Sequence, residues 1–176
     1  MTDLARRIHD TAHITGQFTL RSGATSSEYF DKYLFESDPK LLAEIAAAMA
    51  ERLEDELDAV DALAGLELGG VPLAVALSQH TGLPSLFVRK EAKTYGTCKL
   101  AEGGDVDGRR LLVVEDVVTS GGQVLASVQD LRDRGARVQA VACVIDREAG
   151  GPEALAVQGL RLRALFTMSA LNAAAA

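Results

Sequence analysis

The chain contains 176 residues, 48% of them hydrophobic, and carries a formal net charge of −7. This length can bury one substantial core and is short for two full domains, so we expect a single domain over residues 1–176. The negative charge opposes attraction to nucleic acid or to an anionic membrane surface, and neither is expected as a partner. No apolar run has the length of a signal peptide or a membrane span, which predicts a cytoplasmic location.

The N-terminal part of the sequence predicts a helix followed by two short strands, at residues 18–20 and 29–33. A longer helix is expected from Pro39 to about residue 57. Asp38 is a favoured N-cap for it, and proline suits the first helical position.

The middle of the chain alternates short apolar runs with helical stretches. The expected strands cover residues 59–66, 85–88, 110–115 and 138–145, and the expected helices cover residues 71–81 and 122–134. Such a βαβ rhythm predicts an α/β fold with a mostly parallel sheet and helices on both faces. Residues 89–108 interrupt the rhythm with charge and glycine, as is typical of a functional loop. The alanine run at 173–176 is expected to be a frayed tail.

The segment most informative about function is Leu111–Gln123, LLVVEDVVTSGGQ. Four apolar residues form a strand that is expected to end in Glu115 and Asp116, and a loop of small residues then leads into a helix. Ligands of open α/β sheets bind at this carboxyl edge. Backbone N–H groups and hydroxyls of residues 119–122 can bind a phosphate at the helix N-terminus. The segment lacks the P-loop and GxGxxG patterns, which argues against those nucleotide-binding classes.

The two carboxylates next to this phosphate loop indicate a ligand with hydroxyl groups. Carboxylates accept hydrogen bonds from a ribose diol, and their charge favours a sugar ring that becomes cationic as its C1 bond breaks. A phosphoribosyl group meets both conditions. The alternative is structural, with Glu115 and Asp116 capping a loop and residues 119–122 forming an ordinary turn.

Residues 111–123 resemble the signature for phosphoribosyl pyrophosphate (PRPP) in the type I phosphoribosyltransferases. The resemblance implies a Rossmann-like core at about residues 38–166, a small N-terminal hood at about 1–37 and a mobile catalytic loop at about 89–108. Glu115 and Asp116 would bind the ribose hydroxyls, and residues 119–123 would surround the 5-phosphate. The predicted PRPP-binding residues are Arg89, Lys90, Lys93, Glu115, Asp116, Val117, Val118, Thr119, Ser120, Gly121, Gly122 and Gln123.

The segment RKEAKTYGT, at residues 89–97, resembles the catalytic loop of the orotate phosphoribosyltransferases. Pyrophosphate gains charge as it leaves, so cations on a mobile loop would stabilise the transition state. The predicted catalytic residues are Lys93, Asp116, Glu115 and Arg89. The family contributes this loop across a dimer interface, which implies a homodimer with shared active sites. The alternative is a solvated charged loop.

Three further segments extend the resemblance. DREAG, at residues 146–150, resembles the D-R-x-x-G element, and it implies that Arg147 forms a forked pair with the carboxylate of orotate while Thr119 also contacts the base. A surface arginine is the alternative. Residues 18–31 resemble the hood over the base, although Tyr29 and Phe30 would serve equally as core aromatics. Residues 67–72 resemble the turn that binds pyrophosphate.

The resemblance implies a transfer of the phosphoribosyl group from PRPP to orotate, giving orotidine 5'-monophosphate and pyrophosphate in pyrimidine biosynthesis. Mg²⁺ is the expected cofactor, held mainly through PRPP and water, so no protein ligands to a metal are predicted. The sequence departs from many bacterial members at Arg21 and Tyr95, where they have lysine and histidine, and in the turn at 67–72, which lacks their lysine. Two alternatives remain open: a transferase for another base, and a non-catalytic regulator that binds nucleic acid.

Overall fold

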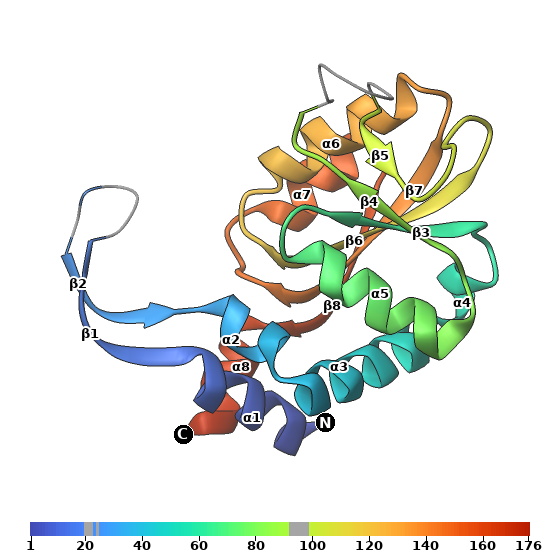
Figure 1. The fold of residues 1–176 in the computed structure, drawn as a ribbon. Coiled ribbons are helices and arrows are strands. Elements are labelled where there is room, and N and C mark those ends of the chain that lie inside the picture. Colours follow the sequence, from blue (N-terminus) through green and yellow to red (C-terminus); the bar gives the residue numbers. More distant parts are fainter. Residues whose placement is uncertain (20–22, 24, 92–98) are drawn as a thin grey trace.

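A computed structural model describes residues 1–19, 23, 25–91 and 99–176 (Figure 1). Its centre is a six-stranded sheet in the order β5-β4-β3-β6-β7-β8. The strands are β3 (Ala62–Leu66), β4 (Ser85–Val88), β5 (Ala101–Glu102), β6 (Arg110–Val118), β7 (Arg137–Asp146) and β8 (Arg161–Thr167). All neighbours pair in parallel except β4 and β5, which are antiparallel. The predicted α/β fold with a mostly parallel sheet is confirmed.

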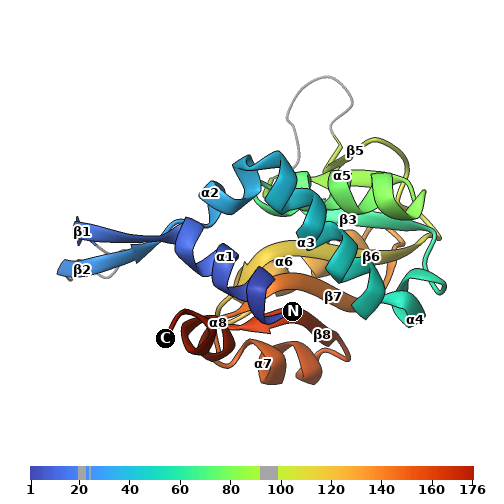
Figure 2. The same cartoon turned by 90° about the horizontal axis from the view of Figure 1, so that it is seen from below.

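Helices cover both faces of this sheet (Figures 1 and 2). One face packs against α3 (Pro39–Arg52) and α5 (Gly70–Thr81), and the other packs against α6 (Gly122–Arg132) and α7 (Gly151–Val157). The central strands are buried on both sides, and β3 has every residue buried. This explains their continuous apolar runs in place of the alternation of a half-exposed strand.

The N-terminal segment forms α1 (Thr2–Ala12), the antiparallel hairpin β1 (His13–Thr19) and β2 (Thr25–Phe30), and the short helix α2 (Lys32–Ser37). In both views the hairpin extends away from the sheet as an arm (Figures 1 and 2). The division into hood, core and loop stays a prediction, and Arg21, Lys93 and Tyr95 lie outside the described residues.

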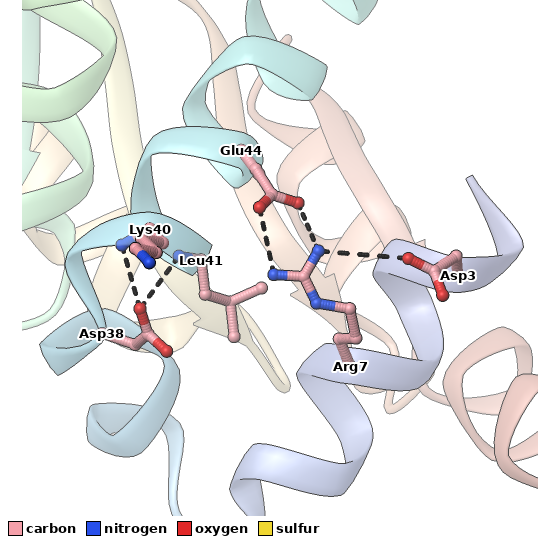
Figure 3. A network of polar contacts seen from close by, with 6 residues as sticks. All are labelled: Asp3, Arg7, Asp38, Lys40, Leu41 and Glu44. Atoms are coloured by element: carbon pink, nitrogen blue, oxygen red, sulfur yellow. Dashed lines mark hydrogen bonds and ion pairs between the residues drawn. The ribbon is translucent and has the colours of Figure 1, made fainter.

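Polar contacts fix α1 to α3 (Figure 3). The Arg7 guanidinium donates to both carboxylate oxygens of Glu44, and it lies 3.9 Å from Asp3. At the start of α3, Asp38 accepts from the backbone N–H groups of Lys40 at 2.9 Å and Leu41 at 3.1 Å. The predicted N-cap is therefore confirmed, with Pro39 in the first turn.

Four local predictions are corrected. Strand β6 continues to Val118, so Glu115 and Asp116 lie within it, because the backbone of residues 117 and 118 still pairs with β7. Residues 32 and 33 belong to α2, whose N-cap is Asp31. The helix expected to reach residue 57 breaks at Leu53, after which α4 (Glu54–Leu57) follows. The alanine run at the C-terminus belongs to α8 (Met168–Ala175), which packs against α1.

Candidate active site

The site lies where the chain reverses its direction across the sheet. From β3 the chain proceeds outward to β4, whereas from β6 it proceeds the other way to β7 and β8. The carboxyl ends of β3 and β6 therefore open on a crevice between diverging connections, where doubly wound sheets bind their ligands. The turn at 67–72 follows β3 and the loop at 119–121 follows β6, so two predicted phosphate-binding segments lie side by side.

Strand β6 carries the acidic pair into this crevice. Asp116 is fully buried and Glu115 is 8% exposed. Glu115 Oε1 accepts from the N–H of Asp116 at 2.9 Å, and Asp116 Oδ1 accepts from the N–H of Val117. Burial, followed by the charge of Asp116, raises the pKa of Glu115 to about 8. Glu115 therefore keeps its proton at neutral pH.

The partner of Asp116 is Lys32, a residue absent from the predicted site. Its Nζ lies 2.6 Å from Asp116 Oδ2, and its side chain is one-third exposed. Burial opposes the charged form, but the bond to Asp116 and the fields of Asp116 and Glu115 outweigh it, so the pKa of Lys32 is raised. The ammonium and the carboxylate form a partly buried ion pair at the floor of the site.

Glu36 approaches Asp116 from the same helix as Lys32. Its Oε1 has no hydrogen-bond donor among the described residues, and its side chain is 8% exposed. Burial, then the charge of Asp116 and a hydrogen bond with it, raises the pKa of Glu36 to about 9. A proton on Glu36 allows it to donate to Asp116, which satisfies both buried carboxyl groups.

Gly69, in the turn after β3, is pressed against these two acids. A Cβ there would lie 1.6 Å from Asp116 Oδ2 and 2.8 Å from Glu36 Oε1. The turn therefore touches the acidic cluster through backbone alone, and any side chain at residue 69 would displace Asp116.

The phosphate loop after β6 depends on two close approaches. Gly121 has φ +79° and is the N-cap of α6, so the backbone turns there in a conformation that favours glycine. A Cβ on Gly151 would lie 2.7 Å from the Thr119 carbonyl oxygen, so α7 packs directly against this loop. Thr119, Ser120, Gly122 and Gln123 are exposed and free to meet a ligand.

Arg147 lies beside the same loop because β7 ends next to β6. Its N–H donates to the Val118 carbonyl oxygen at 2.8 Å, and its side chain is exposed. The following residue, Glu148, has φ +56° and accepts from the N–H of Ser169 at 2.8 Å and from its hydroxyl at 2.9 Å. Helix α8 thus anchors the segment that presents Arg147.

The base of the predicted catalytic loop is tied to the sheet. Arg89 Nε lies 3.6 Å from Glu102 Oε1, and the Arg89 N–H donates to the Leu100 carbonyl at 2.9 Å. The Lys90 N–H donates to the Glu67 carboxylate. The loop therefore leaves the body beside the turn at 67–72, while its predicted catalytic residue Lys93 lies outside the described residues.

Comparison with known proteins assigns this architecture to a family. The family model described as the phosphoribosyl transferase domain matches residues 35–160. A curated orotate phosphoribosyltransferase from a Nocardioides species is 53% identical over 171 residues, covering 97% of this chain and 94% of that protein. The chain belongs to the orotate phosphoribosyltransferase family. An orotate phosphoribosyltransferase from Halobacterium salinarum is 47% identical, covering 89% of this chain and 87% of that protein.

A solved orotate phosphoribosyltransferase supports the same family at the level of structure. The crystal structure of the Mycobacterium tuberculosis enzyme in complex with PRPP superposes with a TM-score of 0.83 at 32% identity, covering 97% of this chain and 98% of that one. The resemblance recognised in residues 89–97, 111–123 and 146–150 therefore led to the correct family.

In this orotate phosphoribosyltransferase fold, a cavity of about 810 Å³ lies in front of the phosphate loop. Its walls come from the hood, from α8 and from the carboxyl edge of the sheet. The lining residues include Lys32, Thr119 and Arg147, together with Tyr29, His13 and Met168. Tyr29 lines the cavity and is 45% exposed, so it is no core aromatic. Phe30 lines the cavity too, but it also packs partly against the core.

Residues 1–19, 23, 25–91 and 99–176 contain no group of three or more His, Cys, Asp or Glu side chains placed to hold a metal ion. None of the helices in these ranges combines the length and the apolar character that crossing a membrane requires.

Lys32 and Glu36 were absent from the predicted site, and Gly69 was predicted only as part of the pyrophosphate turn, without its contact with Asp116. The first two are one helical turn apart, a spacing that indicates a shared helix face. The prediction of a strand at 29–33 excluded that helix. The absence of a side chain at Gly69 gave no signal of its neighbour Asp116, which is distant in sequence.

Proposed function

We propose that this chain transfers the 5-phosphoribosyl group of PRPP to orotate, giving orotidine 5'-monophosphate and pyrophosphate. The relatives that it matches over nearly their full length are named for this enzyme, and one of the matching crystal structures contains PRPP. The observation that carries the proposal is the buried acidic pair of β6, next to a phosphate loop and within the same crevice as Arg147.

Asp116 and Glu115 would act on the ribose. As the bond from C1 to pyrophosphate breaks, positive charge develops on the sugar ring, and a buried carboxylate stabilises that charge more strongly than one in water would. The Asp116 carboxylate pairs with Lys32, and Glu115 keeps a proton with which it can donate to a ribose hydroxyl. The orotate N1 then attacks C1 from the cavity side.

The 5-phosphate and the diphosphate of PRPP would occupy the two loops of the crevice. The exposed residues Thr119, Ser120, Gly122 and Gln123, with Gly121, Val117 and Val118, form the site for the 5-phosphate at the start of α6. The diphosphate would lie at the turn after β3. Arg89, Lys90 and Lys93 would close over it and stabilise the leaving group, with Lys93 and Arg89 as the catalytic cations.

Arg147 and Thr119 would select the base. A guanidinium forms two parallel hydrogen bonds with a carboxylate, and orotate carries a carboxylate that uracil and the purines lack. Both residues line the cavity, and the hydrogen bond from Arg147 to Val118 sets them side by side.

Mg²⁺ is the proposed cofactor, and it would arrive with PRPP. Within the described residues, no group of three or more His, Cys, Asp or Glu side chains is placed to hold a metal ion. When bound, the metal would neutralise oxygens of the diphosphate and thus make it a better leaving group. The chain is proposed to act in the cytoplasm as a homodimer whose subunits share their active sites.

The direct test is to follow the loss of orotate absorbance with purified chain, Mg²⁺ and PRPP, with uracil, adenine, hypoxanthine and xanthine in parallel. We expect turnover with orotate alone. Turnover with another base would retain the PRPP site and refute the base assignment. No turnover with any base, together with a shift of RNA or DNA in a gel, would favour the non-catalytic regulator that binds nucleic acid.

Arg147→Ala tests the role of this residue in base selection. We expect its KM for orotate to rise about 10- to 100-fold, because a charge-assisted forked pair is lost. The KM for PRPP should stay within about threefold, since the phosphate loop is intact. Arg134→Ala is the matched control, because Arg134 pairs with Asp130 on α6, away from the crevice. A rise in KM for both substrates would refute a role specific to the base.

A further inference from the structure

The turn after β3 lacks a cation of its own. Its sequence, Glu67-Leu68-Gly69-Gly70-Val71-Pro72, contains one acidic residue and no lysine or arginine. Backbone N–H groups can approach a phosphate there, but a diphosphate carries several negative charges and its binding sites normally include a cationic side chain. The Glu67 carboxylate, which accepts from the Lys90 N–H, adds negative charge.

Lys32 is placed to supply the missing charge. Its Nζ lies 2.6 Å from Asp116 Oδ2, and the same oxygen lies 1.6 Å from the position of a Cβ on Gly69. The ammonium and the turn thus touch the same carboxylate oxygen. Lys32 also lines the cavity and is one-third exposed, so a ligand in the crevice can reach it. Within the described residues, no other ion pair reaches Glu115 or Asp116.

Binding of the ribose would release this ammonium. Asp116 has two carboxylate oxygens, and Oδ1 already accepts from the N–H of Val117. Oδ2 is closed to solvent and lies against the Lys32 ammonium, so a ribose hydroxyl that binds this oxygen competes with Lys32 for it. A partly buried ammonium that loses its carboxylate needs another anion, because an unpaired buried charge is costly. The diphosphate, entering at the adjacent turn, is the anion that arrives with the ribose.

We infer that Lys32 is a diphosphate-binding residue, stored on Asp116 in the substrate-free chain and transferred to the diphosphate of PRPP when the ribose hydroxyls occupy Asp116. The inference rests on the proposed PRPP site and adds a residue to it. Glu36 supports the exchange, since the protonated Glu36 can donate a hydrogen bond to Asp116 and hold that carboxylate in place after Lys32 has left.

The test compares ligands that differ in the diphosphate. Binding of inorganic pyrophosphate, PRPP and orotidine 5'-monophosphate would be measured by calorimetry with Mg²⁺ present, for the wild type and for Lys32→Gln and Lys32→Arg. Lys32→Gln should weaken pyrophosphate and PRPP about 10- to 100-fold, the loss of one charge-assisted hydrogen bond. Its affinity for orotidine 5'-monophosphate should change less than about threefold, because this ligand has no diphosphate. Lys32→Arg should restore most of the affinity for pyrophosphate.

Lys40→Gln provides the control for net charge, since Lys40 is exposed at the start of α3 and is outside the site. It should leave all three affinities unchanged. Circular dichroism would confirm folding, and Lys32→Met would replace Lys32→Gln if the latter did not fold. Equal losses for all three ligands would overturn the inference, because Lys32 would then act only through Asp116. Unchanged binding of pyrophosphate would also overturn it.

The test of Lys32 does not depend on which base accepts the phosphoribosyl group. If the enzyme used a base other than orotate, the selective loss of pyrophosphate binding in Lys32→Gln would still stand. If orotate turnover were confirmed while pyrophosphate binding did not depend on Lys32, only the present inference would fail.

Discussion

At the scale of single residues, the site is built around one buried negative charge. Asp116 is fully buried, and Lys32 neutralises it from α2. Glu115 and Glu36 surround it with carboxyl groups whose pKa values are raised to about 8 and about 9, mainly by burial. Three carboxyl groups can share this small volume because two of them keep their protons at neutral pH.

This arrangement predicts how stability depends on pH. Between pH 4.5 and about 9, the unfolded chain has lost the Glu36 proton while the folded chain retains it, so the free energy of unfolding should fall as pH rises through this window. Glu36→Gln removes this contribution and should flatten the decline. Urea unfolding at pH 5, 7 and 9 measures it. Parallel pH profiles for wild type and variant would show that Glu36 is not held protonated.

At the scale of elements, two short helices that the sequence did not predict, α2 and α8, position residues of the site. The capping side chain of Asp31 starts α2 at Lys32, and this aims Lys32 and Glu36 at Asp116. At the other end of the chain, Thr167 caps α8 by accepting from the N–H of Ala170 at 3.2 Å. Glu148 accepts from Ser169 in the same turn. The C-terminal segment is therefore a docked element that supports Arg147.

A substitution in α8 tests this docking. Leu171 is fully buried in the core cluster that includes α1, so Leu171→Ala should lower the free energy of unfolding by about 2–5 kcal/mol. Val157→Ala is the control, since Val157 is 82% exposed and its truncation should cost less than about 0.5 kcal/mol. Chemical denaturation of both variants gives the comparison. A negligible effect of Leu171→Ala would restore the interpretation of residues 173–176 as a frayed tail.

At the scale of the whole molecule, the proposed homodimer makes a prediction about mixed subunits. Lys93 would serve the partner's site, whereas Arg147 would serve its own. Lys93→Ala should mainly lower kcat and Arg147→Ala should mainly raise KM, so each variant alone is weakly active at low orotate. Mixed subunits should regain about a quarter of wild-type activity, because half of the dimers carry one intact site. The assay follows orotate after mixing and brief partial unfolding.

The control for this experiment is each variant treated alone, which should regain nothing. A mixture no more active than its components would contradict sharing of active sites between subunits. Sedimentation of the wild type then decides between an unshared dimer and a monomer.

Local sequence was sufficient wherever the controlling interactions are local. Apolar runs separated by helical stretches predicted the parallel sheet, because burial on both faces imposes that pattern. Asp38 and Pro39 predicted the start of α3, since a cap acts within one turn. Residues 111–123 contained the acidic pair and the phosphate loop within a single strand–loop–helix unit, and with residues 89–97 and 146–150 they led to the family.

Only the tertiary structure decided which groups surround Asp116. Three segments meet there: α2 with Lys32 and Glu36, the turn after β3 with Gly69, and β6 with Asp116 itself. No periodicity along the chain predicts contacts between segments so far apart in sequence. The docking of α8 against α1 likewise depends on a surface that exists only after folding. Secondary structure and a contiguous phosphate loop follow from neighbouring residues, whereas charge pairing and burial follow from distances that folding creates.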